Sequence, residues 1–160
     1  MSSFIDLYAK GKSLGRFDLP SEVTGEGKGV FRLQKSVKGG GNGIVFEAKP
    51  LRGVKKIEGR CAIKLLRQQE DACIDRFKNE LRIIRMLDHR QISRCYDAGD
   101  IDLGSGYMVP WIAMQLGDVN LREDVQKEGP LPPESLLNVV TQMCDAIDQP
   151  SLERNHSPRY

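Results

Sequence analysis

Aromatic residues, histidines and net charge are all scarce in this sequence, and each shortage excludes a class of partner. Aromatic residues make up 6% of the 160 residues, and they do not interleave with basic residues as a base-stacking surface requires. Lys and Arg together number 24 against 22 Asp and Glu, so the overall charge attracts neither nucleic acid nor an anionic membrane. We therefore expect no nucleic-acid or membrane partner.

Long apolar segments are also missing. No stretch stays apolar for the roughly 20 residues that a membrane-spanning helix needs, and the first residues lack the basic and apolar regions of a signal peptide. The cysteines and histidines are Cys61, Cys73, Cys95, Cys144, His89 and His156. They form no CxxC pair and no metal-ligand spacing, so we predict reduced thiols, no metal site and a cytoplasmic location.

What is present suits one modest globular protein with four segments. Residues 1–29 are rich in Gly, Ser, Lys and Glu, and they predict a flexible leader with a short helix near Phe4–Tyr8. Residues 30–117 carry strand patterns and one helix, and residues 118–148 carry two further helices. Residues 149–160 form a polar tail that resembles nothing before it.

Apolar periodicity predicts an α+β fold with a five-stranded antiparallel sheet. The strand patterns lie at 31–37, 44–46, 61–66, 92–96 and 108–116, and the turn-rich segment 102–106 joins the last two as a hairpin. Between the third and fourth strands, Phe77, Leu81, Ile84 and Leu87 recur at helical spacing, which predicts a helix over 71–87. Two helices follow, at 121–128 and from Pro132, the second with an apolar stripe of Leu136, Val140, Met143 and Ile147.

A cluster of glycines lies between the first two strands, in the segment Lys38–Val45. Closely spaced glycines allow backbone N–H groups to approach phosphate oxygens, although a tight β-turn uses the same residues. No Gly-Lys-Ser/Thr follows, which excludes a Walker loop. A strand rather than a helix comes next, which disfavours a dinucleotide-binding fold.

Lys64 stands in the otherwise apolar strand Cys61–Leu66, and Glu80 is the acidic residue in the central turns of the next helix. A lysine that holds nucleotide phosphates needs a carboxylate to orient it, and these two residues supply such a pair. An ordinary surface salt bridge is the alternative for the same two residues.

These motifs together resemble the protein kinase family, most closely the bacterial serine/threonine type. The Gly-x-x-Gly-x-Val pattern, Ala-Ile-Lys at 62–64 and Arg-Phe-Lys-Asn-Glu-Leu at 76–81 come in the order that kinases show. The segments 87–92 and 111–116 look like the family's loop after its helix and its fifth strand. The resemblance covers about residues 31–147 and implies the ATP-binding amino-terminal lobe, the hinge, and two helices of an incomplete second lobe.

The resemblance also implies a role for individual residues. Gly40 and Gly43 would cover the phosphates, and Lys64, paired with Glu80, would hold the α and β phosphates. The residues implied to surround the purine are Val37, Val45, Ala62, Met114 as gatekeeper, and the hinge residues Gln115, Leu116 and Gly117. One departure is that Lys38 stands where the family has its first glycine.

The family's catalytic loop His-Arg-Asp and its magnesium-binding Asp-Phe-Gly do not occur in the sequence. The family member transfers a phosphoryl group from ATP to protein hydroxyls with Mg²⁺, whereas this chain is expected to bind ATP without turning it over. The alternative is a non-catalytic, pseudokinase-like module that binds another protein; the substrate or partner is unknown.

The tail prompts a hypothesis of a shifted reading frame. Permitted codons for Pro150–Tyr160, read one base later, encode Leu-His-Ser-Lys-Gly-Ile-Ile-His-Arg-Asp, which resembles the family's catalytic-loop approach. Sequencing the gene through codons 145 to 165 decides this, because codons that cannot yield the shifted peptide would refute it.

Overall fold

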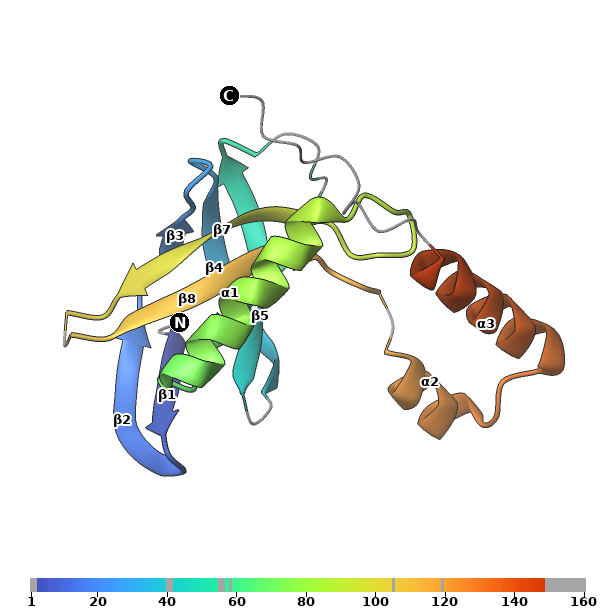
Figure 1. The fold of residues 1–160 in the computed structure, drawn as a ribbon, viewed down its shortest axis with the longest axis horizontal. Coiled ribbons are helices and arrows are strands. Elements are labelled where there is room, and N and C mark those ends of the chain that lie inside the picture. The colour runs from blue at the N-terminus through green and yellow to red at the C-terminus, as the bar shows by residue number, and fades with distance from the viewer. Residues whose placement is uncertain are drawn as a thin grey trace, which may run out of the picture.

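The computed structural model describes residues 3–39, 42–54, 57, 59–104, 106–118 and 120–148. Within them the elements are β1 (Ser3–Ala9), β2 (Lys12–Leu19), β3 (Glu22–Thr24), β4 (Val30–Gly39), β5 (Gly43–Arg52), β6 (Cys61–Leu66), α1 (Asp71–Met86), β7 (Cys95–Asp102), β8 (Met108–Gln115), α2 (Leu121–Glu128) and α3 (Pro133–Ile147) (Figure 1). The tail and Gly40 lie outside the described residues.

The main sheet is antiparallel, with the strand order β3-β4-β5-β6-β8-β7. The predicted α+β class is confirmed, but the predicted count of five strands is wrong because β3 pairs with β4 and adds a sixth. Strands β1 and β2 form a separate antiparallel pair. Glu22–Thr24 is too short for its alternation to stand out from the flanking turn residues, which is why the sequence pattern missed it.

Strand β6 separates two cores because its side chains alternate between the faces of the sheet. On one face Cys61, Ile63 and Leu65 are fully buried in the larger core. Leu66 lies in the smaller core on the other face. Lys64 points to this second face as well, at the position that the alternation predicts.

The β1–β2 hairpin covers the larger core, where Ile5 and Leu7 are fully buried. The prediction of a helix near Phe4–Tyr8 is therefore wrong, and most of the predicted leader is folded against the sheet. The reason is that Phe4 and Tyr8 place apolar surface on the outer face of the strand. This obscured the two-residue period of Ile5 and Leu7.

Helix α1 packs against the opposite face of the sheet and confirms the helix predicted over 71–87 (Figure 1). Its buried side chain is Phe77, which is 4% exposed and packs with Leu66, Ala98 and Ile112. Thus the amphipathic stripe that predicted the helix also determines which face contacts the sheet.

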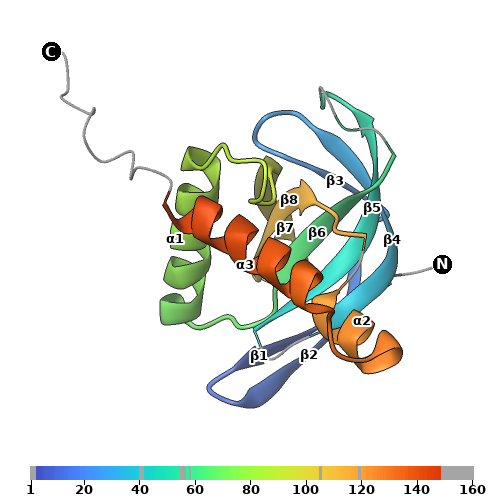
Figure 2. The same ribbon diagram turned by 90° about the vertical axis from the view of Figure 1, so that its right-hand side faces the viewer.

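The remaining elements lie close to their predicted places. The strand predicted at 92–96 is observed later in the chain, as β7 (Cys95–Asp102). The predicted bounds were wrong because β7 alternates acidic and small residues and therefore carries a weak apolar signal. The β7–β8 hairpin and helices α2 and α3 agree with prediction. Helices α2 and α3 lie to one side of the sheet in Figure 1 and in front of it in Figure 2, which is turned by 90°. No described helix is long and apolar enough to span a membrane.

All four cysteines are free thiols, as predicted, and their environments differ. Burial raises the pKa of the Cys61 thiol to about 11 from an ordinary value of 9.0. At pH 8 its thiolate fraction is therefore about a hundredfold smaller than that of an ordinary thiol.

We expect a maleimide to modify exposed Cys144 rapidly and Cys61 only after unfolding, as followed by peptide mass spectrometry. A Cys144→Ser variant is the control that removes the fast phase, and rapid native labelling of Cys61 would contradict the prediction.

Candidate functional site

Lys64 of β6 and Glu80 of α1 form an ion pair, with 2.5 Å between Lys64 Nζ and Glu80 Oε1. Both side chains keep contact with solvent, at 30% and 46% exposure. The ammonium group also lies 5.7 Å from the centre of the Phe77 ring. The helix thus supplies both a carboxylate and an aromatic face to the same lysine, which restricts the ammonium to one side of the sheet.

This ion pair lines a cavity of about 240 Å³ between α1 and the sheet. The other lining residues are Asn42, Leu66, Cys73, Arg76 and Phe77. Asn42 comes from the glycine-rich turn between β4 and β5, so the structure brings that turn to the ion pair. Lysine and arginine side chains beside a glycine-rich turn form a cationic environment suited to an anion.

Gly43 begins β5 and pairs with Leu66 of β6. A methyl group at this position would lie 2.9 Å from the Leu65 carbonyl oxygen, which is closer than van der Waals contact. Glycine is therefore required here by the close approach of two strands, independently of any ligand.

A second cavity, of about 340 Å³, lies where β4 approaches the segment after β8. Its lining includes Val37 of β4 and the predicted hinge residues Leu116 and Gly117. The remaining lining residues are Lys35, Ser36, Glu47, Arg60 and Asp118. Val37 is 52% exposed, so its apolar side chain is available for contact at this cavity.

The strand register places the other predicted purine residues on one face of the sheet. Val45 pairs with Lys64, and Ala62 pairs with Met114. Directly opposed residues of antiparallel strands share a face, as do residues two apart on one strand. These four side chains therefore lie on the same face, and Gln115, which ends β8, leads into the hinge segment.

Two features of these cavities were not anticipated from the sequence. Arg76 of α1 donates a hydrogen bond from Nη2 to Cys73 Sγ at 3.2 Å, and both residues line the cavity of the ion pair. Their spacing of three residues on a predicted helix was the available signal, because such residues are neighbours on a helix surface.

The second unanticipated feature is the Glu47 carboxylate, which is buried near the hinge. Glu47 is 7% exposed, accepts a hydrogen bond from Arg60 Nη1 at 3.1 Å and lies 3.8 Å from Lys35 Nζ. A charged residue inside the apolar run 44–48 was the signal for it, because a buried carboxylate needs compensating partners.

The described part of the chain contains no group of three or more His, Cys, Asp or Glu side chains placed to hold a metal ion. The described residues therefore do not build a magnesium site.

Comparison with known proteins adds a family match. The family model described as protein tyrosine and serine/threonine kinase matches residues 31–156. Among curated proteins, the serine/threonine-protein kinase PknB of Mycobacterium leprae is 31% identical over 91 residues, which is 54% of this chain and 14% of that protein. PksC, a serine/threonine-protein kinase of Streptomyces coelicolor, is 31% identical over 101 residues, covering 58% of this chain and 18% of its own length. The chain thus spans less than a fifth of these relatives.

Proposed function

Because the chain belongs to the protein tyrosine and serine/threonine kinase family, we propose that it forms the ATP-binding part of a serine/threonine protein kinase. The observation that carries the proposal is the ion pair between Lys64 and Glu80 beside the glycine-rich turn. A surface salt bridge needs neither a cavity nor a second cation, and this pair has both, since Arg76 lines the same space.

In this proposal the cavity at the ion pair receives the phosphates of ATP. The Lys64 ammonium would contact the α and β phosphates while Glu80 orients it, and backbone N–H groups of the turn at Gly40 and Gly43 would cover them. Glu80 holds the lysine from one side only, so the ammonium keeps hydrogen atoms free to donate to phosphate oxygens.

The cavity at the hinge would receive the purine. Val37, Val45 and Ala62 supply apolar surface above the ring, with Met114 as the gatekeeper behind it. The backbone of residues 115–117 would provide the polar groups that recognise the purine edge. Five of the eight residues that line this cavity are polar or charged, so Val37 and Leu116 supply its apolar lining.

Turnover needs groups that the sequence does not contain. Phosphoryl transfer requires residues that hold Mg²⁺ and an aspartate that orients the attacking hydroxyl. Magnesium, when bound in a family member, neutralises charge on the phosphates; the residues described in this chain do not supply its ligands. We therefore propose that this chain binds ATP without transferring its phosphate.

The test is the thermal stability of the 160-residue chain with and without ATP. Ligand at about 100 times its Kd adds about 2.7 kcal/mol of stability, which raises Tm by roughly 5–10 °C for a chain of this size. Lys64→Met should lose most of that rise, because it removes the ammonium group that contacts the phosphates.

Lys49→Met is the matched control, because Lys49 is an exposed lysine of β5 that lines neither cavity. It should keep the full response to ATP. The proposal fails if the unsubstituted chain shows no ATP-dependent rise in Tm, or if Lys64→Met and Lys49→Met respond alike.

An interaction module is the second candidate, and helix α3 is the observation that favours it. Its stripe of Leu136, Leu137, Val140, Met143 and Ile147 is between 46% and 80% exposed. Exposed apolar surface of this extent is typical of a protein contact. Absence of an ATP response together with full folding of the chain would favour this function over nucleotide binding.

A further inference from the structure

Strand β1 runs beside the segment that joins β6 to α1. The Tyr8 N–H donates to the Arg67 carbonyl oxygen at 3.0 Å, and the Gln69 N–H donates to the Tyr8 carbonyl oxygen at 2.8 Å. Two residues after Tyr8, the Lys10 N–H donates to Glu70 Oε1 at 2.6 Å. Glu70 immediately precedes α1, so the hairpin is hydrogen-bonded to the side chain of the residue before this helix.

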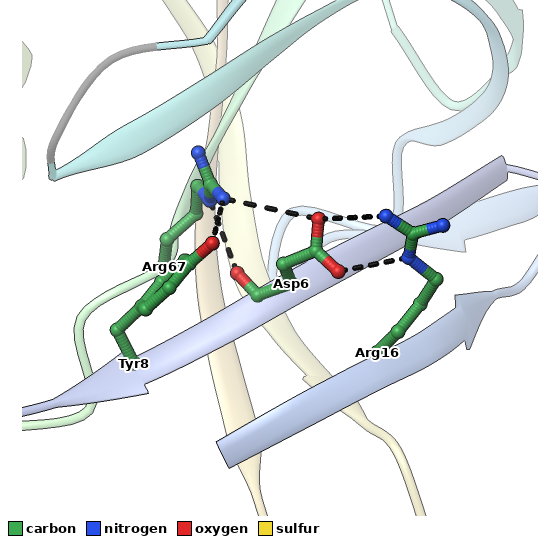
Figure 3. A network of polar contacts seen from close by, with 4 residues as sticks. All are labelled: Asp6, Tyr8, Arg16 and Arg67. Carbon is green, nitrogen blue, oxygen red and sulfur yellow. Dashed lines mark hydrogen bonds and ion pairs between the residues drawn. The ribbon is translucent and has the colours of Figure 1, made fainter. Parts of the chain in front are cut away.

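Arg67 is the centre of this contact (Figure 3). Its Nε donates to the Asp6 carbonyl oxygen and its Nη2 donates to the Tyr8 hydroxyl oxygen, both at 3.0 Å. The guanidinium carbon lies 4.8 Å from the centre of the Tyr8 ring, and the side chain is only 17% exposed. An arginine held by two hydrogen bonds and a ring has little conformational freedom left, which makes it a rigid link.

The backbone of Arg67 connects the same point to the glycine-rich turn. Its N–H donates to the Asn42 carbonyl oxygen at 3.0 Å, and its guanidinium lies close to Gly39 at the end of β4. Arg67 therefore binds the amino-terminal hairpin with its side chain and the turn with its backbone. It also lies between Lys64 and α1 in the chain.

The amino-terminal segment reaches the other end of α1 as well. Glu26 Oε2 lies 3.0 Å from Arg85 Nη2 in the last turn of the helix. The Glu26 N–H donates to the Ala98 carbonyl oxygen of β7 at 2.8 Å, which anchors this loop on the sheet. Residues before β4 thus contact Glu70, the residue that precedes α1, and Arg85 in the last turn of the helix.

We propose that residues 3–29 are a built-in brace, centred on Arg67, that positions the glycine-rich turn and α1 so that Lys64, Glu80 and the turn meet around the phosphates. This rests on the proposed function and deepens it, because it assigns a positioning role to residues outside the family match, which begins at residue 31. Arg67 lines neither cavity, so it acts through Asn42 and the start of α1 rather than on the nucleotide.

The test compares Arg67→Met with Arg16→Met in the 160-residue chain. Arg16 is the matched control because its guanidinium donates to the same Asp6, through Oδ1 at 2.8 Å, and lies over the Phe4 ring. These contacts stay within the β1–β2 pair. Amide hydrogen exchange reports the brace without nucleotide, and calorimetric titration with ATP reports its effect on binding.

For Arg67→Met we expect exchange to accelerate roughly tenfold at residues 42–45 and in the first two turns of α1, with β5, β6 and β8 otherwise unchanged. The affinity for ATP should fall roughly tenfold, while Arg16→Met changes neither quantity. Tyr8→Phe, which removes only the hydroxyl acceptor, should shift both quantities in the same direction by about threefold, and it decides the matter if Arg67→Met does not fold.

Equal exchange in the Arg67 and Arg16 variants, or uniform acceleration across the sheet, would overturn the brace and leave Arg67 a general stabilising residue. Local acceleration with unchanged ATP affinity would overturn the positioning role. If the unsubstituted chain does not bind ATP, the proposed function fails. The exchange data are measured without nucleotide, so they still decide whether residues 3–29 position the turn and the helix.

Discussion

A chain that begins at residue 30 is expected to lose most of its folding stability, although the family match begins only at residue 31. The reason is that residues 1–29 supply part of the main core through the β1–β2 hairpin and β3. Ile5 and Leu7 are fully buried, and Leu19 and Val23 are 6% and 3% exposed. Removing residues 1–29 would expose the face of β6 that these side chains cover.

Single substitutions set the scale of this effect. Leu7→Ala is expected to cost about 2–5 kcal/mol, the range for a buried leucine that leaves a cavity. The truncation removes this side chain with Ile5 and the hairpin around them, so its cost should exceed that of Leu7→Ala. Urea unfolding followed by circular dichroism measures both, since the midpoint falls with the free energy of unfolding.

Phe4→Ala is the matched control for the substitution. Phe4 lies on the outer face of the same strand and is 44% exposed, so its removal should cost under about 1 kcal/mol. A truncated chain with the urea midpoint of the 160-residue chain would show that the hairpin contributes nothing to the core. Equal effects of Leu7→Ala and Phe4→Ala would contradict the assignment of the faces of β1.

Asp97→Ala is expected to destabilise the protein by roughly 2–4 kcal/mol, because it leaves buried N–H groups without an acceptor. Asp97 is buried, with 6% of its surface exposed. Its carboxylate accepts hydrogen bonds from the N–H groups of Gly27, Gly29 and Ala98, at 3.0, 2.9 and 2.8 Å. It thereby attaches the loop before β4 to strand β7.

The loop before β4 packs closely against the Asp97 carboxylate. A methyl group at Gly25 would overlap the Asp97 carboxylate, so the glycine-rich composition of residues 25–29 is explained by packing around one buried carboxylate. Asp102→Ala is the control on the same strand, because Asp102 is exposed and its carboxylate accepts a hydrogen bond from the Gly104 N–H at 2.8 Å. It should cost about 1 kcal/mol or less. Equal urea midpoints for the two variants would contradict the role of Asp97.

The site was more accessible to sequence reasoning than the amino-terminal segment. Lys64 interrupts an apolar strand, and Glu80 lies in a helix whose stripe predicts its facing side. Both patterns are local, because a strand alternates every two residues and a helix repeats every 3.6. In the structure the Lys64 ammonium and the Glu80 carboxylate lie 2.5 Å apart, so these two faces meet.

Long-range polar contacts were beyond the same reasoning. Asp97 and Gly27 are 70 residues apart, and Arg67 and Tyr8 are 59 apart. The residues around Asp97 and around Arg67 show no local sequence pattern that would identify these distant partners. In the sequence, Gly25–Gly29 indicated a flexible leader, since glycine-rich composition is equally typical of an ordered loop and of an unfolded one.

The sequence by itself determined the order of the elements from β4 to α3, the kinase resemblance, and the two charged residues that meet at the candidate phosphate site. Local side-chain periodicity and motif order suffice for these, because they depend on neighbouring residues. Only the tertiary structure decided that strands β1 to β3 form within residues 3–24 and complete the core, that Arg67 bonds the hairpin beside the glycine-rich turn, and that Asp97 attaches the loop before β4 to β7. Burial and hydrogen-bond partners arise from segments that are distant in the chain, so they are defined only once the sheet has assembled.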